Sequence, residues 1–115
     1  MTIDLADLAA QSLKAQFEQQ VGNDTFPFVH GLRELRDSAA HCRTSSAGDR
    51  AVVAFILEKI CGGWAYDLDE RPVSKTETDA LRQKVLNPVT RAIEFLNGAS
   101  GDPLLIAADL VGVAP

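Results

Sequence analysis

Apolar residues recur at every third or fourth position along most of this 115-residue chain, and this period constrains the fold more than any other feature. A period of 3.6 residues places apolar side chains on one face of a helix, whereas a half-buried strand requires alternation at every second residue. The sequence contains no convincing strand. We therefore predict an all-α protein, a single-domain helical bundle of four to five helices spanning residues 1–115.

The first two predicted helices each carry one narrow apolar stripe. The first covers residues 3–21 and ends at Gly22, because glycine tolerates a left-handed backbone. Asp24 or Thr25 caps the second helix. The two stripes are, in order, Leu5, Ala9, Leu13, Phe17 and Val21, and Phe28, Leu32, Leu35, Ala39 and Cys42.

The third predicted helix follows a capping box formed by Ser46 and Asp49. Its sequence AVVAFILEKIC, residues 51–61, is apolar almost all round, so we expect this helix to lie centrally. Two glycines, Gly62 and Gly63, follow and should end the helix in a left-handed turn. The residues after them are then a connecting loop.

The fourth predicted helix opens at a second capping box, Ser74 with Glu77, and runs to Gly98. Pro88 lies in its middle and cannot donate the backbone hydrogen bond that the helix requires, so we expect a kink or a break. The predicted buried face consists of Leu81, Val85, Val89, Ile93 and Leu96.

The C-terminal segment, residues 102–115, is strongly apolar. It begins at Asp102-Pro103, which start a short turn or helix, and continues as LLIAADLVG. A segment this apolar must be covered. Either it folds back over the open end of the bundle, or it forms a homo-oligomer or another protein contact.

The charge balance narrows the classes of partner. The 16 acidic and 11 basic residues give a net charge of −5, which argues against a nucleic-acid binder and suits a basic protein partner. No apolar stretch has the length of a membrane span, and no signal peptide precedes the first helix. We therefore expect a cytoplasmic protein without membrane association, in which both cysteines are reduced.

The stretch after the two glycines is the strongest candidate for a binding site. It contains the chain's single Trp and single Tyr, followed by acids, and loops on a rigid scaffold often carry binding residues. We expect Trp64 to pack back against the bundle, leaving an acidic loop that meets a basic partner. The predicted partner-binding residues here are Trp64, Tyr66, Asp67, Asp69 and Glu70.

Two arginines of the second helix, Arg36 and Arg43, lie beside its apolar stripe on the helical wheel. Arginines that flank an apolar seam often bind acidic groups at interfaces, so we include both among the partner-binding residues. The alternative is that they pair with acids of the chain itself, such as Glu18 in the first helix.

The opposite face of the second helix carries His30, Glu34, Asp37 and His41, within about 60° of one another. Imidazole and carboxylate groups one turn apart can chelate a transition metal. The alternative is a solvated face with favourable pairs one turn apart, and we assign no metal site.

His30 also supports a resemblance to histidine phosphotransfer domains, which are small acidic four-helix bundles. Their phosphoaccepting His is followed by Leu at +2 and a basic residue at +3, as in Leu32 and Arg33 here. At +4 those domains have Gly, whereas this chain has Glu34, whose carboxylate would repel a phosphoryl group. The resemblance implies phosphotransfer signalling through His30.

No arrangement of nucleophile, base or phosphate loop is recognisable, and Cys61 at a helix end should have a raised pKa. We therefore predict a protein-interaction module, acting as a regulator, adaptor or inhibitor, without catalytic residues or cofactor. A phosphotransfer protein using His30 is the alternative.

Overall fold

A computed structural model describes residues 25–70 and 73–115. This part of the chain is entirely helical and contains no strand, which confirms the all-α class for the described residues. The helix predicted over residues 3–21 lies outside them, so a total of four to five helices stays a prediction. The described helices are α2 (Thr25–Thr44), α3 (Gly48–Glu70), α4 (Lys75–Leu96) and α5 (Pro103–Val111).

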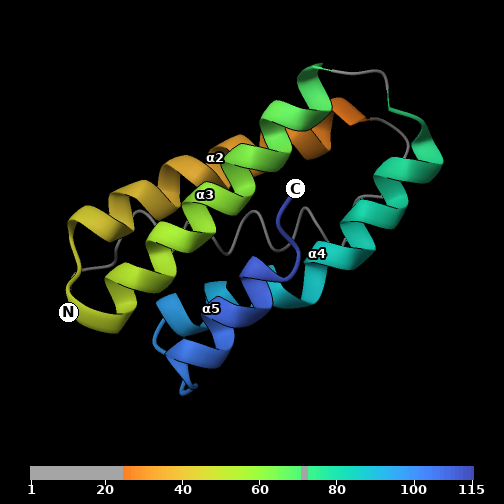
Figure 1. Cartoon of the computed structure of the whole chain (residues 1–115). Coiled ribbons are helices and arrows are strands. Elements are labelled where there is room, and N and C mark those ends of the chain that lie inside the picture. The colour runs from red at the N-terminus through yellow and green to blue at the C-terminus, as the bar shows by residue number, and fades with distance from the viewer. Residues whose placement is uncertain (1–24, 71–72) are drawn as a thin grey trace.

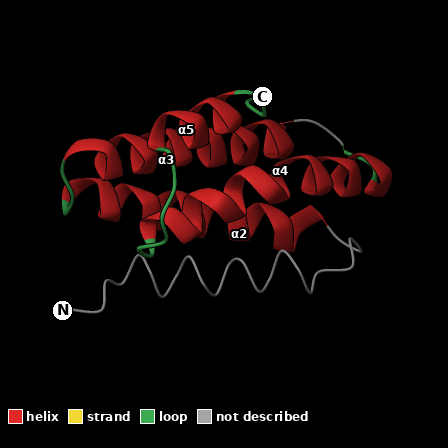
Figure 2. Cartoon of the chain, turned by 90° about the horizontal axis from the view of Figure 1, so that it is seen from below, coloured by secondary structure: helices red, strands yellow, loops and turns green. Residues whose placement is uncertain are grey.

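Helix α3 is the central element. It runs antiparallel to α2 along most of its length, and α5 packs between α3 and α4 (Figure 1). As a result α3 touches each of the other three described helices, as its apolar sequence predicted. Figure 2, seen from below, shows α5 and α2 on opposite sides of the molecule, with α3 beside each of them.

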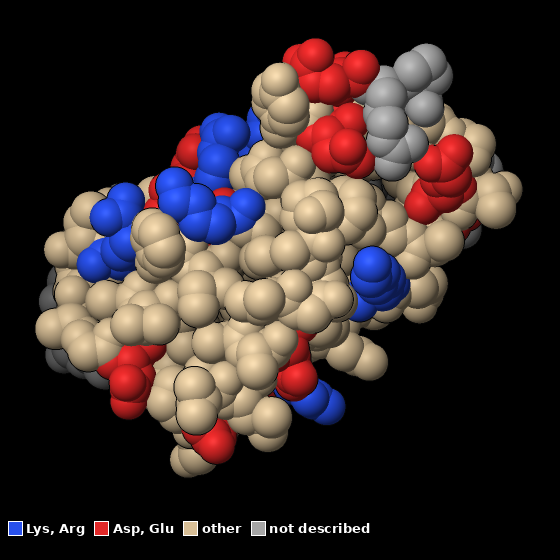
Figure 3. Space-filling view, in the orientation of Figure 1, with Lys and Arg blue, Asp and Glu red and all other residues tan. Residues whose placement is uncertain are grey.

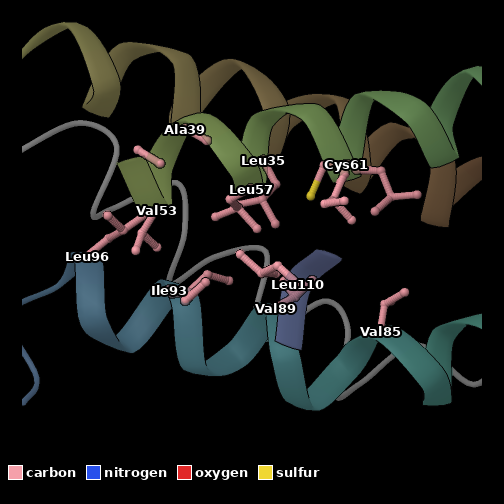
Figure 4. Packing of buried hydrophobic residues seen from close by; sticks show 14 of the residues in the cluster. Leu35, Ala39, Val53, Leu57, Cys61, Val85, Val89, Ile93, Leu96 and Leu110 are labelled. Carbon is pink, nitrogen blue, oxygen red and sulfur yellow. The ribbon is translucent and has the colours of Figure 1, made fainter. Parts of the chain in front are cut away.

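The core lies where the apolar faces of the helices meet (Figure 4). Side chains of α2 and α3 point toward those of α4, and Leu110 of α5 enters between them. The predicted stripes are confirmed wherever they are described, because each residue is 8% exposed or less. These residues are Leu32, Leu35, Ala39 and Cys42 of α2, and Leu81, Val85, Val89, Ile93 and Leu96 of α4.

The predicted ends of α4 and α5 are also confirmed. The hydroxyl of Ser74 accepts a 3.1 Å hydrogen bond from the backbone N–H of Glu77, and Asp102 accepts a 3.0 Å bond from the N–H of Leu104. Both bonds satisfy donors that the first turn of a helix leaves unpaired. Gly98, which follows the C-cap residue Asn97 of α4, has a φ of 104°, a conformation that favours glycine.

Helix α3 does not end at the glycine pair, and the predicted loop is wrong. The helix continues to Glu70, and Gly62 and Gly63 are not among the glycines with positive φ. The two turns beyond the pair bury Ala65 and Leu68 in the core. This burial outweighs the cost of a glycine within a helix, which is about 1 kcal/mol each.

Pro88 lies inside α4, which is one helix from Lys75 to Leu96. Of the two predicted outcomes, a break is therefore not observed, and a kink stays a prediction. The residues on both sides, Val85 and Val89, are buried, so the same apolar face continues past the proline.

Candidate interaction surface

The two glycines inside α3 do not end the helix but are positions where other parts of the chain pack closely against it. A side chain on Gly62 would begin 3.1 Å from Cδ of Arg36 in α2, and one on Gly63 would begin 2.9 Å from Cγ of Pro115. Both distances are shorter than ordinary carbon contacts. The missing side chains therefore let Arg36 and the C-terminal turn lie directly against α3.

Trp64 holds that C-terminal turn in place. Its indole Nε1 donates a 2.7 Å hydrogen bond to the carbonyl oxygen of Val113, and the ring packs partly buried against the core, as the sequence predicted. The ammonium of Lys84 lies 5.9 Å from the centre of the same ring. Trp64 is thus engaged within the chain, and its contact with a partner stays a prediction.

The predicted acidic residues lie on the last turns of α3, directly after Tyr66. The Tyr66 side chain is 68% exposed, and Glu70 is exposed four residues further on. Asp69 forms an ion pair with Arg33 of α2, which engages part of its charge within the chain. Asp67 is half-buried. The structure therefore brings these residues together, but on a rigid helix.

The two arginines predicted to bind a partner contact carboxylates of the chain itself. Arg43 donates a 2.9 Å hydrogen bond to Glu58 of α3, and Arg36 donates a 3.0 Å bond to Asp37. Glu18, the partner considered from the sequence, lies outside the described residues. Pairing within the chain is thus observed with other acids, and partner binding by either arginine stays a prediction.

An exposed apolar surface on α3 and α5, here called the α3–α5 face, was missed by the sequence analysis. Figure 3 shows a broad area over these helices without charge, bounded by basic residues along one edge and acidic residues where α3 ends. The exposed fractions are 52% for Val52, 45% for Phe55, 68% for Tyr66, 79% for Leu104 and 58% for Val111.

The α3–α5 face is hollowed where the two helices begin. A cavity of about 250 Å³ opens there, and Val52 and Leu104 lie on its wall. Leu105 of α5 is also exposed, but it lines a separate hollow against α4.

Val52 and Phe55 are three positions apart, and Tyr66 lies eleven positions beyond Phe55, so helical spacing already places these three residues on one side of α3. The strongly apolar run around Val52 and Phe55 concealed this group, because it predicted burial on every side.

The polar face of α2 is a solvated row of side chains in the described structure. Nε2 of His30 lies 2.6 Å from Oε1 of Glu34, and both side chains are about half exposed. Asp37 is engaged by Arg36. Within the described residues, no group of three or more His, Cys, Asp or Glu side chains is placed to hold a metal ion. Phosphotransfer through His30 stays a prediction, and the Glu34 carboxylate lies at one of its two ring nitrogens.

Cys61 is a buried thiol in the middle of α3. The sequence placed it at a helix end, where the helix dipole would raise its pKa. The structure corrects that cause, because the helix continues to Glu70 and burial raises the pKa of the Cys61 thiol to about 12. The thiol therefore remains protonated near neutral pH, a state in which it is a poor nucleophile.

Comparison with known proteins identifies no relative of this chain. No protein-family model, curated protein or solved structure matches this chain. None of the helices within residues 25–70 and 73–115 combines the length and apolar character that a membrane crossing requires. The geometry of the chain itself therefore carries the functional argument.

Proposed function

We propose that this chain is a protein-interaction module that acts as a regulator, adaptor or inhibitor by surface complementarity instead of catalysis. The observation that carries the proposal is the α3–α5 face. There Val52, Phe55 and Leu104 remain 45–79% exposed, although other apolar residues of the same helices are buried in the core. Contiguous exposed apolar surface on a soluble protein marks contact with another molecule.

The rigidity of the face supports the same role. Its side chains project from helices whose opposite sides lie in the core, through Val53 and Leu57 of α3 and Ile106 and Leu110 of α5. A preorganised surface loses little conformational freedom when it binds. The cavity beside Leu104 offers space for one apolar side chain of a partner, an arrangement typical of strong interface contacts.

The acidic end of α3 supports a partner with basic residues next to its apolar contact. Tyr66 and Glu70 are exposed there, and opposite charges at the edge of an interface speed association. Asp69 contributes less, since it is already paired with Arg33. A cytoplasmic setting suits this role, because both cysteines are free, buried thiols that reducing conditions preserve.

Affinity capture with matched variants tests the proposal. The full chain would serve as bait in a lysate of its native cells, beside the double variant Val52→Glu, Leu104→Glu. The control is Leu105→Glu, which places the same charge on the same helix but against α4. We expect the retained protein to be lost with the double variant and kept with the control. Equal retention by all three baits would contradict a role for the α3–α5 face.

A further inference from the structure

A pocket opens between α3 and α4, at the end of the molecule where α3 stops and α4 begins (Figure 1). Its volume is about 260 Å³, and its walls include Trp64 and Leu68 of α3 and Ala80, Leu81 and Lys84 of α4. Leu68 and Leu81 are buried and lie at its base. We call this site the Trp64 pocket.

The Trp64 ring is a fixed wall of the pocket. Its indole Nε1 donates a 2.7 Å hydrogen bond to the carbonyl oxygen of Val113, so the chain itself sets the orientation of the ring. An aromatic ring beside Leu68 and Leu81 holds water poorly, because ordered water needs polar partners. The Trp64 pocket is therefore suited to the apolar part of a ligand.

Lys84 places one positive charge at the pocket. Its side chain is exposed, and its ammonium lies 5.9 Å from the centre of the Trp64 ring. Within residues 25–70 and 73–115, no carboxylate pairs with this ammonium. A contact with an aromatic ring leaves the N–H donors of a lysine able to bind an anion.

Glu77 carries the negative charge of the same wall. It precedes Lys84 by seven residues, which is two helical turns or about 10 Å along α4. Glu77 already interacts within the chain, whereas Lys84 has no acidic partner among the described residues. An anionic group of a ligand therefore belongs at Lys84, and a second one nearer to Glu77 would be repelled.

The volume of the pocket limits the size of the ligand. An enclosed apolar cavity of about 150 Å³ holds a benzene molecule, and pockets for drug-sized ligands begin at about 300 Å³. With about 260 Å³, the Trp64 pocket has room for one ring and a short chain.

We infer that the Trp64 pocket binds a small organic monoanion, a carboxylate joined by a short chain to one apolar ring. The ring of the ligand packs against Trp64 and Leu81, and its carboxylate accepts hydrogen bonds from the Lys84 ammonium. This binding activity goes beyond the proposed function, because the pocket shares none of its residues with the α3–α5 face.

Two ligands of matched shape test the inference, 4-phenylbutyrate and its uncharged amide, 4-phenylbutanamide. Trp64 is the only Trp of the chain, so nuclear magnetic resonance of the isotope-labelled full chain gives a single indole N–H signal that reports on the pocket. We expect 4-phenylbutyrate to shift this signal with a dissociation constant of about millimolar order. The amide should bind about fivefold more weakly, because it has no charge for Lys84.

Two pairs of variants locate the site. Lys84→Gln should make the acid and the amide bind alike, whereas the control Lys59→Gln, which removes a lysine held over the ring of Phe55, should keep the preference. Ala80→Leu should fill the pocket and weaken both ligands about tenfold. Its control is Gln83→Leu, at an exposed position of α4 outside the pocket, which should bind both ligands as the natural chain does. Circular dichroism would verify that each variant is folded.

Three results would overturn the inference. The first is an indole signal that neither ligand shifts, even well above the expected dissociation constant. The second is equal binding of acid and amide by the natural chain. The third is a preference for the acid that survives Lys84→Gln. If any of these occurs while Val52→Glu, Leu104→Glu still abolishes capture of another protein, the inference fails and the proposed function stands.

Discussion

The indole nitrogen of Trp64 donates a 2.7 Å hydrogen bond to the carbonyl oxygen of Val113, residues 49 positions apart in the sequence. This bond joins the middle of α3 to the turn that follows α5. One residue earlier, Gly63 leaves room for Pro115. Together these contacts hold the turn after α5 against α3.

Replacing Trp64 by Phe should destabilise the protein by about 1–2 kcal/mol, because the Val113 carbonyl loses its partly buried donor. Urea unfolding followed by circular dichroism would measure the change. The matched control is Tyr66→Phe, which removes a polar group from a side chain that is 68% exposed and should change stability by less than about 0.5 kcal/mol. Equal effects of the two substitutions would show that the indole bond contributes nothing.

Gly63→Ala should reveal the contact with Pro115 through a double-mutant cycle. Alanine in a helix interior is favoured over glycine by about 1 kcal/mol, but a methyl group at this position would begin 2.9 Å from the Pro115 ring. We expect Gly63→Ala to bring little or no stabilisation in the natural chain. With Pro115→Gly in place, it should stabilise by about 1 kcal/mol, because the ring is gone. Identical gains in both backgrounds, measured by urea unfolding, would argue against the contact.

The thiol of Cys61 should make stability fall at high pH. Burial raises its pKa from 9.0 to about 12 in the folded protein, so the unfolded chain releases this proton first. The contribution is complete below pH 9 and is lost as pH rises toward 12, at roughly 1 kcal/mol per pH unit.

Cys61→Ala isolates this effect from the titration of other groups, because the variant retains every other ionisable side chain. The stability difference between wild type and variant should stay constant up to about pH 8 and decline above pH 9. Denaturant unfolding at a series of pH values would measure it. Two curves that remain parallel through pH 10 would be inconsistent with a buried, protonated thiol.

Ser74→Ala should cost about 1 kcal/mol, within a range of about 0.5–2, because the N–H of Glu77 loses its acceptor at the start of α4. Thr76→Ala is the control, since Thr76 is exposed in the same turn and alanine has the higher helix propensity. Urea unfolding of both variants would separate capping from general surface effects. A Ser74→Ala protein as stable as wild type would mean that water replaces the cap without loss.

Much of the fold could be predicted from local patterns. The stripe of α4, from Leu81 to Leu96, follows the helical period and is buried, and Ser74 and Asp102 cap the helices that they were predicted to cap. The candidate site was predicted less well. Tyr66 and Glu70, predicted as partner-binding residues of a loop, are exposed but lie on a helix, and Val52 and Phe55 were expected to be buried.

The sequence by itself determined where α2, α4 and α5 form and which faces of α2 and α4 are buried, because both depend on spacing and side-chain chemistry within a few turns. Only the tertiary structure decided that α3 passes through Gly62 and Gly63. Glycine favours a helix end by about 1 kcal/mol, a local preference that burial of Ala65 and Leu68 exceeds. It also decided which residues of α3 stay exposed in the part of the chain that the structure describes. That depends on where α2 and α5 pack, and Val52, Phe55 and Tyr66 remain exposed.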